Sequence, residues 1–321
     1  MDIEILLFLQ NIREAIGGSL NTFMVFMSTT AVDYYILVPS LIIFWVVDKE
    51  KGSRILLTWG SALLTGSFLK ATFCIYRPWV KDARVKPPKE IFAGATGYSF
   101  PSGHTVSSGS FWSGLALAYK ENRKLAGFAV CVIALTMFSR IFLGVHTPQD
   151  ILAGLAIALV CAFGVSKLYD WVVKNPEKDW VILAAATVIC IALLCYLKLK
   201  PYPMDYVDGK LLVDPKKMTV DGFKDPGMFY GIVLGWFLER RFVKFDVSGT
   251  KQQKIMRALV GGILTVFWYT AVAGPIGKAV GSGLVHFLTQ ASTPIVFMFF
   301  YPMLFKKRKS NNGRIQDTLQ I

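Results

Sequence analysis

The chain has 321 residues, of which 54% are hydrophobic and 17% charged, and its formal net charge is +14. Its mean hydropathy of +0.47 is higher than a water-soluble domain of this length normally shows. The composition therefore argues against an ordinary soluble domain and predicts an all-α, polytopic transmembrane helical bundle.

The N-terminal segment, residues 1–30, differs from the rest of the chain. An amphipathic stretch over Ile5-Leu6-Leu7-Phe8-Leu9 is followed by charged residues and then interrupted by Gly17-Gly18. This pattern predicts an interfacial helix that lies along the membrane surface. The start Met1-Asp2-Ile3-Glu4 lacks the basic residues of a cleavable signal peptide.

About nine apolar segments follow, and most approach the ~20 residues needed to cross a bilayer. They run roughly over 33–48, 54–74, 103–120, 124–143, 149–168, 179–197, 226–240, 256–274 and 283–304. We expect a core over 31–175 and accessory transmembrane helices over 176–305, with a polar loop at 198–225. A basic C-terminal tail, 306–321, completes the chain.

Lys and Arg are concentrated in short loops that would all lie on one side of the membrane. They include Lys49, Lys51, Arg54, Lys120, Arg123, Lys124, Lys174, Lys178, Arg240, Arg241 and Lys244. The positive-inside rule then puts these loops and the tail in the cytoplasm, and the other ends of the segments on the extracytoplasmic face. No basic stripe with interleaved aromatic residues is present, so we expect no nucleic-acid partner.

The second apolar segment ends in the polar group Lys70, Arg77 and Pro78. We expect both cations on one side of a helix that stops at the proline. Arginine offers a planar fork for phosphate and lysine a point charge, so the pair predicts phosphate binding.

The third apolar segment opens with Pro101-Ser102-Gly103-His104. Ser102 is expected to cap a helix, and Gly103 would let a ligand approach the backbone. Exposed amides at a helix start bind phosphate oxygens, and His104 would act as general acid for a departing oxygen.

The third polar group joins the fourth and fifth segments and contains Ser139-Arg140, His146, Thr147-Pro148 and Asp150. Thr147-Pro148 predicts a helix start, with Asp150 in its first turn. The carboxylate can then accept a hydrogen bond from one nitrogen of His146, which leaves the other nitrogen free to attack. Arg140 would reach the same point from the preceding segment.

All three polar groups fall at segment ends on the same membrane face, which predicts one phosphate site. Three aromatic residues flank the motifs and would wall a substrate entrance, although interface belts use the same residue types. They are Trp79, Tyr98 and Phe100. No set of His, Cys, Asp or Glu has metal-ligand spacing, so we expect neither a metal nor a cofactor.

Over roughly 50–170 the chain resembles the type 2 phosphatidic acid phosphatase superfamily, whose three signatures match at 70–78, 101–104 and 139–150. The resemblance implies a metal-independent phosphatase with a six-helix-type core and a phosphohistidine intermediate. By position, His146 would be the nucleophile, Asp150 its partner and His104 the general acid. The same match implies that the phosphate is held by Lys70, Arg77, Ser102, Gly103 and Arg140.

The nine-span plan is similar to the glucose-6-phosphatase and sphingoid-phosphate phosphatase branches, although Asp150 departs from the glucose-6-phosphatase pattern. We therefore expect hydrolysis of a lipid phosphomonoester or pyrophosphate, such as phosphatidate, polyprenyl pyrophosphate or a sphingoid phosphate. Hydrolysis of a soluble sugar phosphate and transfer of phosphate to another lipid remain alternatives. A phosphate-binding channel or lipid translocator and a vanadate haloperoxidase are weaker ones. The expected partners are the lipid substrate and the bilayer, and the oligomeric state stays open.

Overall fold

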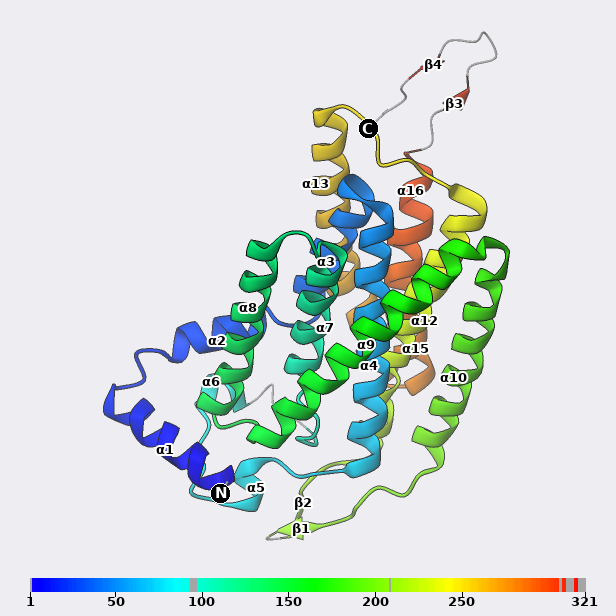
Figure 1. Ribbon diagram of the computed structural model, residues 1–321. Coiled ribbons are helices and arrows are strands. Elements are labelled where there is room, and N and C mark those ends of the chain that lie inside the picture. Colours follow the sequence, from blue (N-terminus) through cyan, green and yellow to red (C-terminus); the bar gives the residue numbers. More distant parts are fainter. Residues whose placement is uncertain (1, 93–96, 208, 306–307, 310–314, 317–321) are drawn as a thin grey trace.

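The computed structural model describes residues 2–92, 97–207, 209–305, 308–309 and 315–316, and most of these are helical (Figure 1). The helices are α1 (Asp2–Ala15), α2 (Asn21–Thr29), α3 (Tyr34–Ile42), η1 (Ile43–Val47), α4 (Lys49–Phe73), α5 (Pro78–Lys81), α6 (Lys89–Phe92), α7 (Gly103–Ala118), α8 (Arg123–Phe142), α9 (Pro148–Lys174), η2 (Pro176–Lys178), α10 (Asp179–Leu199), α11 (Pro215–Gly222), α12 (Lys224–Leu238), η3 (Glu239–Val243), α13 (Lys251–Phe267), η4 (Trp268–Ala273), α14 (Gly274–Val280), α15 (Gly283–Ile295), η5 (Val296–Phe300) and α16 (Tyr301–Met303).

Four two-residue strands form two antiparallel pairs. They are β1 (Tyr206–Val207) with β2 (Lys210–Leu211), and β3 (Arg308–Lys309) with β4 (Ile315–Gln316). The expected polar loop 198–225 therefore contains a small hairpin and the helix α11. The rest of the expected basic tail 306–321 lies outside the described residues.

Helices occupy all nine ranges expected to span the membrane, but the number nine is not confirmed. Among the described residues, five helices are long and apolar enough to cross a bilayer, or six if the bent pair Asn21–Thr29 and Tyr34–Val47 counts as one span. Three of the expected spans, α4, α7 and α12, do not meet this test. Many of their residues are buried against other helices, including serines, threonines and glycines that would be unfavourable facing lipid.

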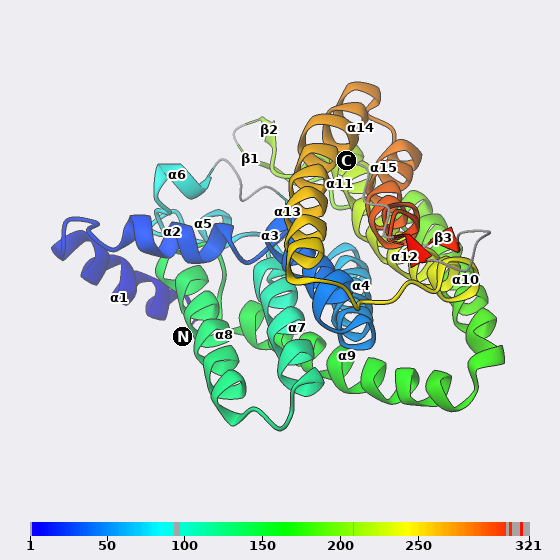
Figure 2. The ribbon, with the colours of Figure 1, turned by 90° about the horizontal axis from the view of Figure 1, so that it is seen from above.

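The helix α4 lies at the centre of the bundle and packs against α7, α9 and α12 (Figures 1 and 2). Three tryptophans anchor this core, because Trp45, Trp59 and Trp236 are almost completely buried. The indole Nε1 of Trp59 donates to Ser107 Oγ at 2.7 Å, which satisfies a polar atom between α4 and α7.

The pair α12 and α15 is held close by a glycine stripe. Gly227, Gly231 and Gly235 are four residues apart and so share one face of α12. A Cβ added at Gly231 would lie 2.3 Å from the carbonyl oxygen of Ala291, and one at Gly227 would lie 2.3 Å from that of Phe287. No larger residue fits, so the stripe fixes the distance between the two helices.

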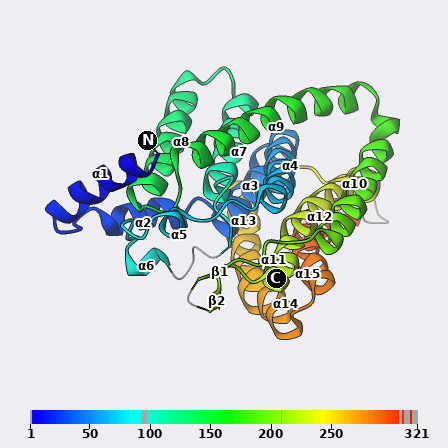
Figure 3. The ribbon, with the colours of Figure 1, turned by 90° about the horizontal axis from the view of Figure 1, so that it is seen from below.

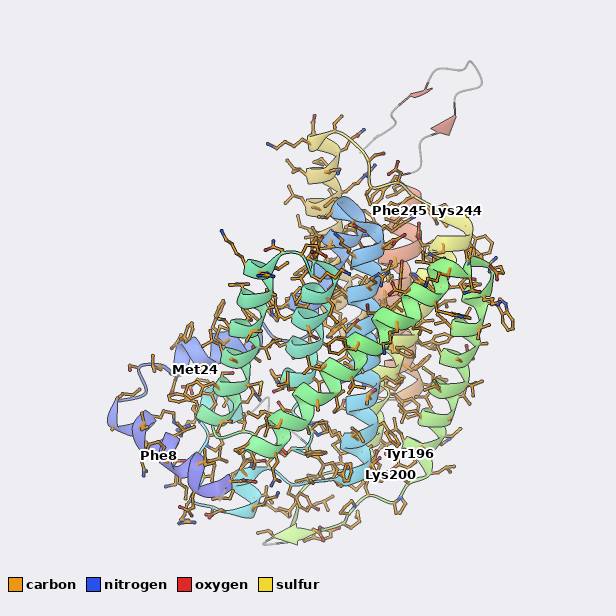
Figure 4. All side chains as sticks on the ribbon, viewed as in Figure 1. Phe8, Met24, Tyr196, Lys200, Lys244 and Phe245 are labelled. Atoms are coloured by element: carbon orange, nitrogen blue, oxygen red, sulfur yellow. The ribbon has the colours of Figure 1, made fainter. Side chains whose placement is uncertain are left out.

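Helices α1 and α2 lie to one side of the bundle, with Gly17 and Gly18 between them in the left-handed region at φ +60° and +70°. Phe8 on α1 is 64% exposed, whereas Met24 on α2 is buried against α8 (Figure 4). The exposed apolar face of α1 is the kind of surface that contacts lipid, so its interfacial position stays a prediction.

The two ends of the bundle differ in what they carry. Lys244 and Phe245 lie at one end, and Tyr196 and Lys200 lie at the other (Figure 4). At this second end the hydroxyl of Tyr196 donates to Thr72 Oγ1 at 3.0 Å, so α10 is tied to the end of α4. The segments with the three sequence motifs lie at this same end, where α5, α6 and β1–β2 also gather (Figures 1 and 3).

Candidate active site

The site forms where three connections meet: the segment after α4, the segment before α7 and the turn between α8 and α9. Ser99 N–H donates to the carbonyl of Ile75 at 2.7 Å, which joins the first connection to the second. Ser102 N–H donates to the carbonyl of Asp150 at 3.0 Å, which joins the second to the third. Residues up to 75 positions apart are thus held together by backbone hydrogen bonds.

His146 and Asp150 form the centre of the site, and both are almost completely buried. Helix α9 starts at Pro148, as the Thr147-Pro148 pair predicts, so Asp150 lies in its first turn. Asp150 Oδ2 lies 3.4 Å from His146 Nδ1 and accepts from Thr147 N–H at 2.8 Å. We therefore assign the Nδ1–H tautomer to His146, which leaves the lone pair of Nε2 available.

Arg77 contacts the reactive side of this imidazole. Its Nη1 lies 2.9 Å from His146 Nε2 and also donates to the carbonyl of Val145 at 3.0 Å. The expectation that Arg77 shares a helix with Lys70 is wrong, because α4 ends at Phe73 and Cys74 adopts a left-handed conformation at φ +49°. Arg77 is extended, as a residue before proline prefers, and reaches the site from a loop.

Lys70 points at the segment that precedes α7. Its ammonium donates to the carbonyls of Pro101 at 2.8 Å, Tyr98 at 3.1 Å and Ser99 at 3.5 Å. Lys70 therefore holds the Pro-Ser-Gly-His segment in place while it adds a positive charge to the site.

The second motif forms the start of α7 as expected. Ser102 is the N-cap, with its Oγ 3.5 Å from the N–H of Thr105 and accepting from the hydroxyl of Thr105 at 3.1 Å. Gly103 is exposed, and a Cβ added there would meet no atom within 4 Å. Together with His104 it lines a cavity of about 280 Å³, so the backbone at this helix start is open to a ligand.

Arg140 is 1% exposed at the end of α8, and its Nη1 donates to Ser28 Oγ on α2. Its Nε has no hydrogen-bond partner among the described residues. A buried guanidinium with an unused N–H is costly unless it finds an acceptor, so Arg140 is suited to bind an anion.

The electrostatics of the site favour a neutral imidazole beside fixed cations. Burial, followed by the charges of Arg77, Arg140 and Lys70, lowers the pKa of His146 well below the ordinary value of 6.5. Burial also lowers the pKa of Arg77, to about 10, so this guanidinium stays charged at neutral pH. Three cations face one carboxylate, and this surplus of positive charge complements a phosphate dianion.

The three aromatic residues proposed for an entrance occupy different places. Trp79 lies 5.8 Å from the Arg77 guanidinium and lines a second cavity, of about 320 Å³, that also borders residues 212–214. Tyr98 is fully buried and stacks on Tyr202, and Phe100 packs edge-on against Phe73. An entrance role stays a prediction.

Sequence reasoning missed two residues of the site. Ser99 Oγ donates to Asp150 Oδ2 at 2.6 Å and lies 3.3 Å from His146 Nδ1. Ser99 lies three residues before Ser102, and its position beside the Pro-Ser-Gly-His motif could have identified it as a candidate site residue. Ser28, the partner of Arg140, is a small residue in an apolar helix and carries no signal of this kind.

Comparison with known proteins finds two family matches along the chain. Residues 52–174 match the family described as PAP2 superfamily, and residues 223–313 match the PAP2 superfamily phosphatase transmembrane extension. The first match covers α4 to α9 and includes all three motifs. No solved structure matches the chain.

Three relatives are each 28% identical to the chain over the aligned residues. A lipid A 4'-phosphatase of Porphyromonas gingivalis is 28% identical over 147 residues, 42% of this chain and 61% of the relative. An undecaprenyl-diphosphatase of Sulfolobus acidocaldarius is 28% identical over 142 residues, 43% of this chain and 65% of the relative. The undecaprenyl-diphosphatase BcrC of Bacillus subtilis is 28% identical over 174 residues, 53% of this chain and 84% of the relative.

The chain thus spans less than two thirds of the first two of these relatives. The two family matches, one after the other along the chain, nevertheless cover most of the helical bundle and confirm the resemblance seen in the motifs. The protein is a multi-pass membrane protein that carries a PAP2 superfamily domain over residues 52–174 and a PAP2 transmembrane extension over residues 223–313.

Proposed function

We propose that this protein is a membrane phosphatase that removes a terminal phosphate from a phosphorylated lipid through a phosphohistidine on His146. The observation that carries the proposal is the buried imidazole, with Nδ1 facing Asp150 and Nε2 facing Arg77. The names of the relatives, which are lipid A and undecaprenyl-diphosphate phosphatases, support a lipid substrate.

In the proposed first step, Nε2 of His146 attacks phosphorus, and the bond from phosphorus to the leaving oxygen breaks. Protonated His104 gives its proton to that oxygen, and Asp150 stabilises the positive charge that develops on the ring of His146. Arg77, Arg140 and the amides at the start of α7 hold the phosphoryl oxygens.

In the second step, a water molecule attacks the phosphohistidine. His104, now neutral, takes a proton from this water, the N–P bond breaks, and inorganic phosphate leaves. A lipid hydroxyl in place of water would make the same intermediate a phosphotransferase, so the acceptor distinguishes the two activities. The three cations supply the charge neutralisation that a metal ion gives in other phosphatases, and we therefore propose a metal-independent reaction.

We also propose nine membrane spans, with the active site on the extracytoplasmic face and the C-terminal tail in the cytoplasm. Two observations support this topology. The basic short loops lie at the end of the bundle opposite the motifs, as Lys244 illustrates (Figure 4). The helices α4, α7 and α12 extend between the two ends beside helices that do pass the test for a span.

The test is phosphate release by the full chain in detergent with EDTA present, from phosphatidate, a polyprenyl diphosphate, a phosphorylated glycolipid and glucose 6-phosphate. We expect His146→Ala to abolish turnover and His104→Ala to reduce it strongly, less so with p-nitrophenyl phosphate, whose leaving group needs no proton. The chain has three histidines, and His286→Gln, on α15, is the matched control that keeps activity. Activity that is lost with EDTA, or that survives in His146→Ala, contradicts the mechanism.

A further inference from the structure

The cavity beside His104 is lined on its far side by the transmembrane extension. Its volume is about 280 Å³, close to the lower end of the ~300–1,000 Å³ typical of ligand pockets. Gly103 and His104 come from the phosphatase core, whereas Asp225 on α12, Tyr269 on η4 and Gln290 on α15 come from the extension. The cavity therefore lies between the extension and the core.

The wall that the extension helps to form is rich in hydrogen-bond acceptors. Asp33, just before α3, accepts from the hydroxyl of Tyr269 at 3.0 Å. Asp225 is half-buried and has no hydrogen bond or ion pair within the part of the chain that the structure describes. Lys224 also lines the cavity, and its ammonium forms an ion pair with Asp221 at 2.6 Å. Two carboxyl groups and one lysine thus line this cavity, so it lacks the surplus of positive charge found at the phosphate site.

The position of His104 relates the two sites. In the proposed reaction its imidazole protonates the leaving oxygen, so phosphorus lies on the side of the cations and the leaving group on the other side of His104. His104 lines the cavity with Asp33 and Asp225, whereas Arg77, Arg140 and His146 are not among the described residues that line it. No hydrogen bond to the His104 ring is found among the described residues, which leaves its ring nitrogens available for a substrate oxygen.

We infer that the leaving group is an alcohol that carries further hydrogen-bond donors, hydroxyl or ammonium groups, next to the phosphate ester. This inference rests on the proposed function and names its substrate class. Carboxylates accept hydrogen bonds from such groups, and a buried acceptor left without a donor costs free energy. A lipid diphosphate is disfavoured because its leaving group is itself an anionic phosphate, which two carboxylates repel. The glyceryl ester oxygens of a diacylglycerol leaving group offer no hydrogen-bond donor to Asp225.

The experiment compares kcat/KM of the full chain in detergent for four lipid substrates. Two have donor-rich leaving groups, a lipid-linked amino-sugar phosphate and a long-chain amino-alcohol phosphate, and two do not, phosphatidate and a polyprenyl diphosphate. Glucose 6-phosphate serves as a fifth, soluble arm. We expect the wild type to prefer the donor-rich lipids by about tenfold to a hundredfold, the range of one or two hydrogen bonds to a charged group.

The variants Asp225→Asn and Tyr269→Phe test the cavity independently. Both change hydrogen bonding with little change in volume, and we expect each to reduce the preference by about tenfold. Asp246→Asn, at an exposed carboxylate that is not among the lining residues of the cavity, is the matched control and keeps the wild-type preference. Because the readout is a ratio of substrates, a variant that is only partly folded lowers all rates and leaves the ratio unchanged.

Two failures are distinguishable. If phosphate release depends on His146 but the wild type shows no preference, or neither cavity variant alters it, the inference is overturned and the proposed function stands. If none of the substrates is hydrolysed and no phosphate can be trapped on His146, the proposed function is overturned, and the inference with it. Preference for glucose 6-phosphate over every lipid would support the donor-rich cavity and contradict the lipid substrate.

Discussion

Replacing Ser99 by alanine removes one hydroxyl from the site and leaves the chain around it in place. Ser99 Oγ donates to Asp150 Oδ2 at 2.6 Å, whereas the backbone N–H of Ser99 donates to Ile75 O at 2.7 Å and does not depend on the side chain. Lys70 also keeps its backbone acceptors on this segment. The substitution Ser99→Ala therefore removes only the hydroxyl, with its hydrogen bond to Asp150 and its 3.3 Å contact with His146 Nδ1.

The size of the effect follows from that bond. A buried hydrogen bond to a charged group contributes about 1.5–3 kcal/mol. Asp150 Oδ2 retains its contacts with Thr147 N–H and His146 Nδ1, but the carboxylate is held less firmly. If the loss falls on the transition state, where the imidazole gains positive charge, kcat/KM falls by about tenfold to a hundredfold.

The assay measures kcat/KM for a lipid phosphate together with thermal unfolding in detergent. Ser108→Ala is the matched control, because Ser108 Oγ is also buried and pairs with Thr136 Oγ1 at 3.2 Å, and no hydrogen bond joins it to Asp150 or His146 among the described residues. We expect the control to lose about 1 kcal/mol of stability and to keep its turnover. Equal activity of Ser99→Ala and wild type, or an equal loss in both variants, would refute the idea that Ser99 positions Asp150.

Three further predictions concern the nucleophile, the helix start and the helix packing. Arg77→Gln removes a positive charge that lowers the pKa of His146. We therefore expect the pKa of His146 to rise and the acid limb of the pH profile of kcat/KM to move to higher pH. An acid limb at the same or a lower pH contradicts the assignment of His146 as the nucleophile. Gly103→Ala adds a methyl group where no protein atom lies within 4 Å, so we expect an unfolding free energy within ~0.5 kcal/mol of wild type. Because the methyl group would occupy space meant for the ligand, we expect kcat/KM to fall by roughly tenfold or more. Full activity of this variant would argue against a ligand at this helix start. Gly231→Ala places a Cβ 2.3 Å from Ala291 O and should destabilise the fold by about 1–3 kcal/mol. Gly164→Ala is the control, because a Cβ there meets no atom within 4 Å, and it should not destabilise the fold. Thermal unfolding of both variants in detergent measures the difference, and equal stability of the two contradicts the prediction.

The sequence predicted the parts of the site that depend on neighbouring residues. Thr147-Pro148 starts a helix for local reasons, and Asp150 then lies within reach of His146 because only four residues separate them. Ser102 caps α7 for the same kind of reason. Such features need no knowledge of the rest of the fold.

Features that depend on distant contacts were not predictable in this way. Arg140 meets Ser28 across 112 residues, and the helix α4 ends at Phe73 although apolar sequence continues to Ile75. The number of spans was also uncertain for a physical reason. A helix surrounded by protein, such as α7, carries serines and glycines and loses the uniform apolar character by which a span is recognised.

The contact between Arg77 and His146 constrains how the reaction can begin. Nε2 cannot accept a hydrogen bond from Arg77 Nη1 at 2.9 Å and attack phosphorus with the same lone pair. A charged phosphate oxygen is a stronger acceptor for guanidinium than a neutral imidazole, so an arriving phosphate draws Arg77 away from Nε2. The nitrogen then becomes free only when the group it must attack is already bound. Arg77 meanwhile keeps its hydrogen bond to Val145 O, next to His146, so the movement from nitrogen to phosphate is a small rotation of one side chain. We therefore propose two successive roles for Arg77: it protects the nucleophile and then binds the phosphate that the nucleophile attacks.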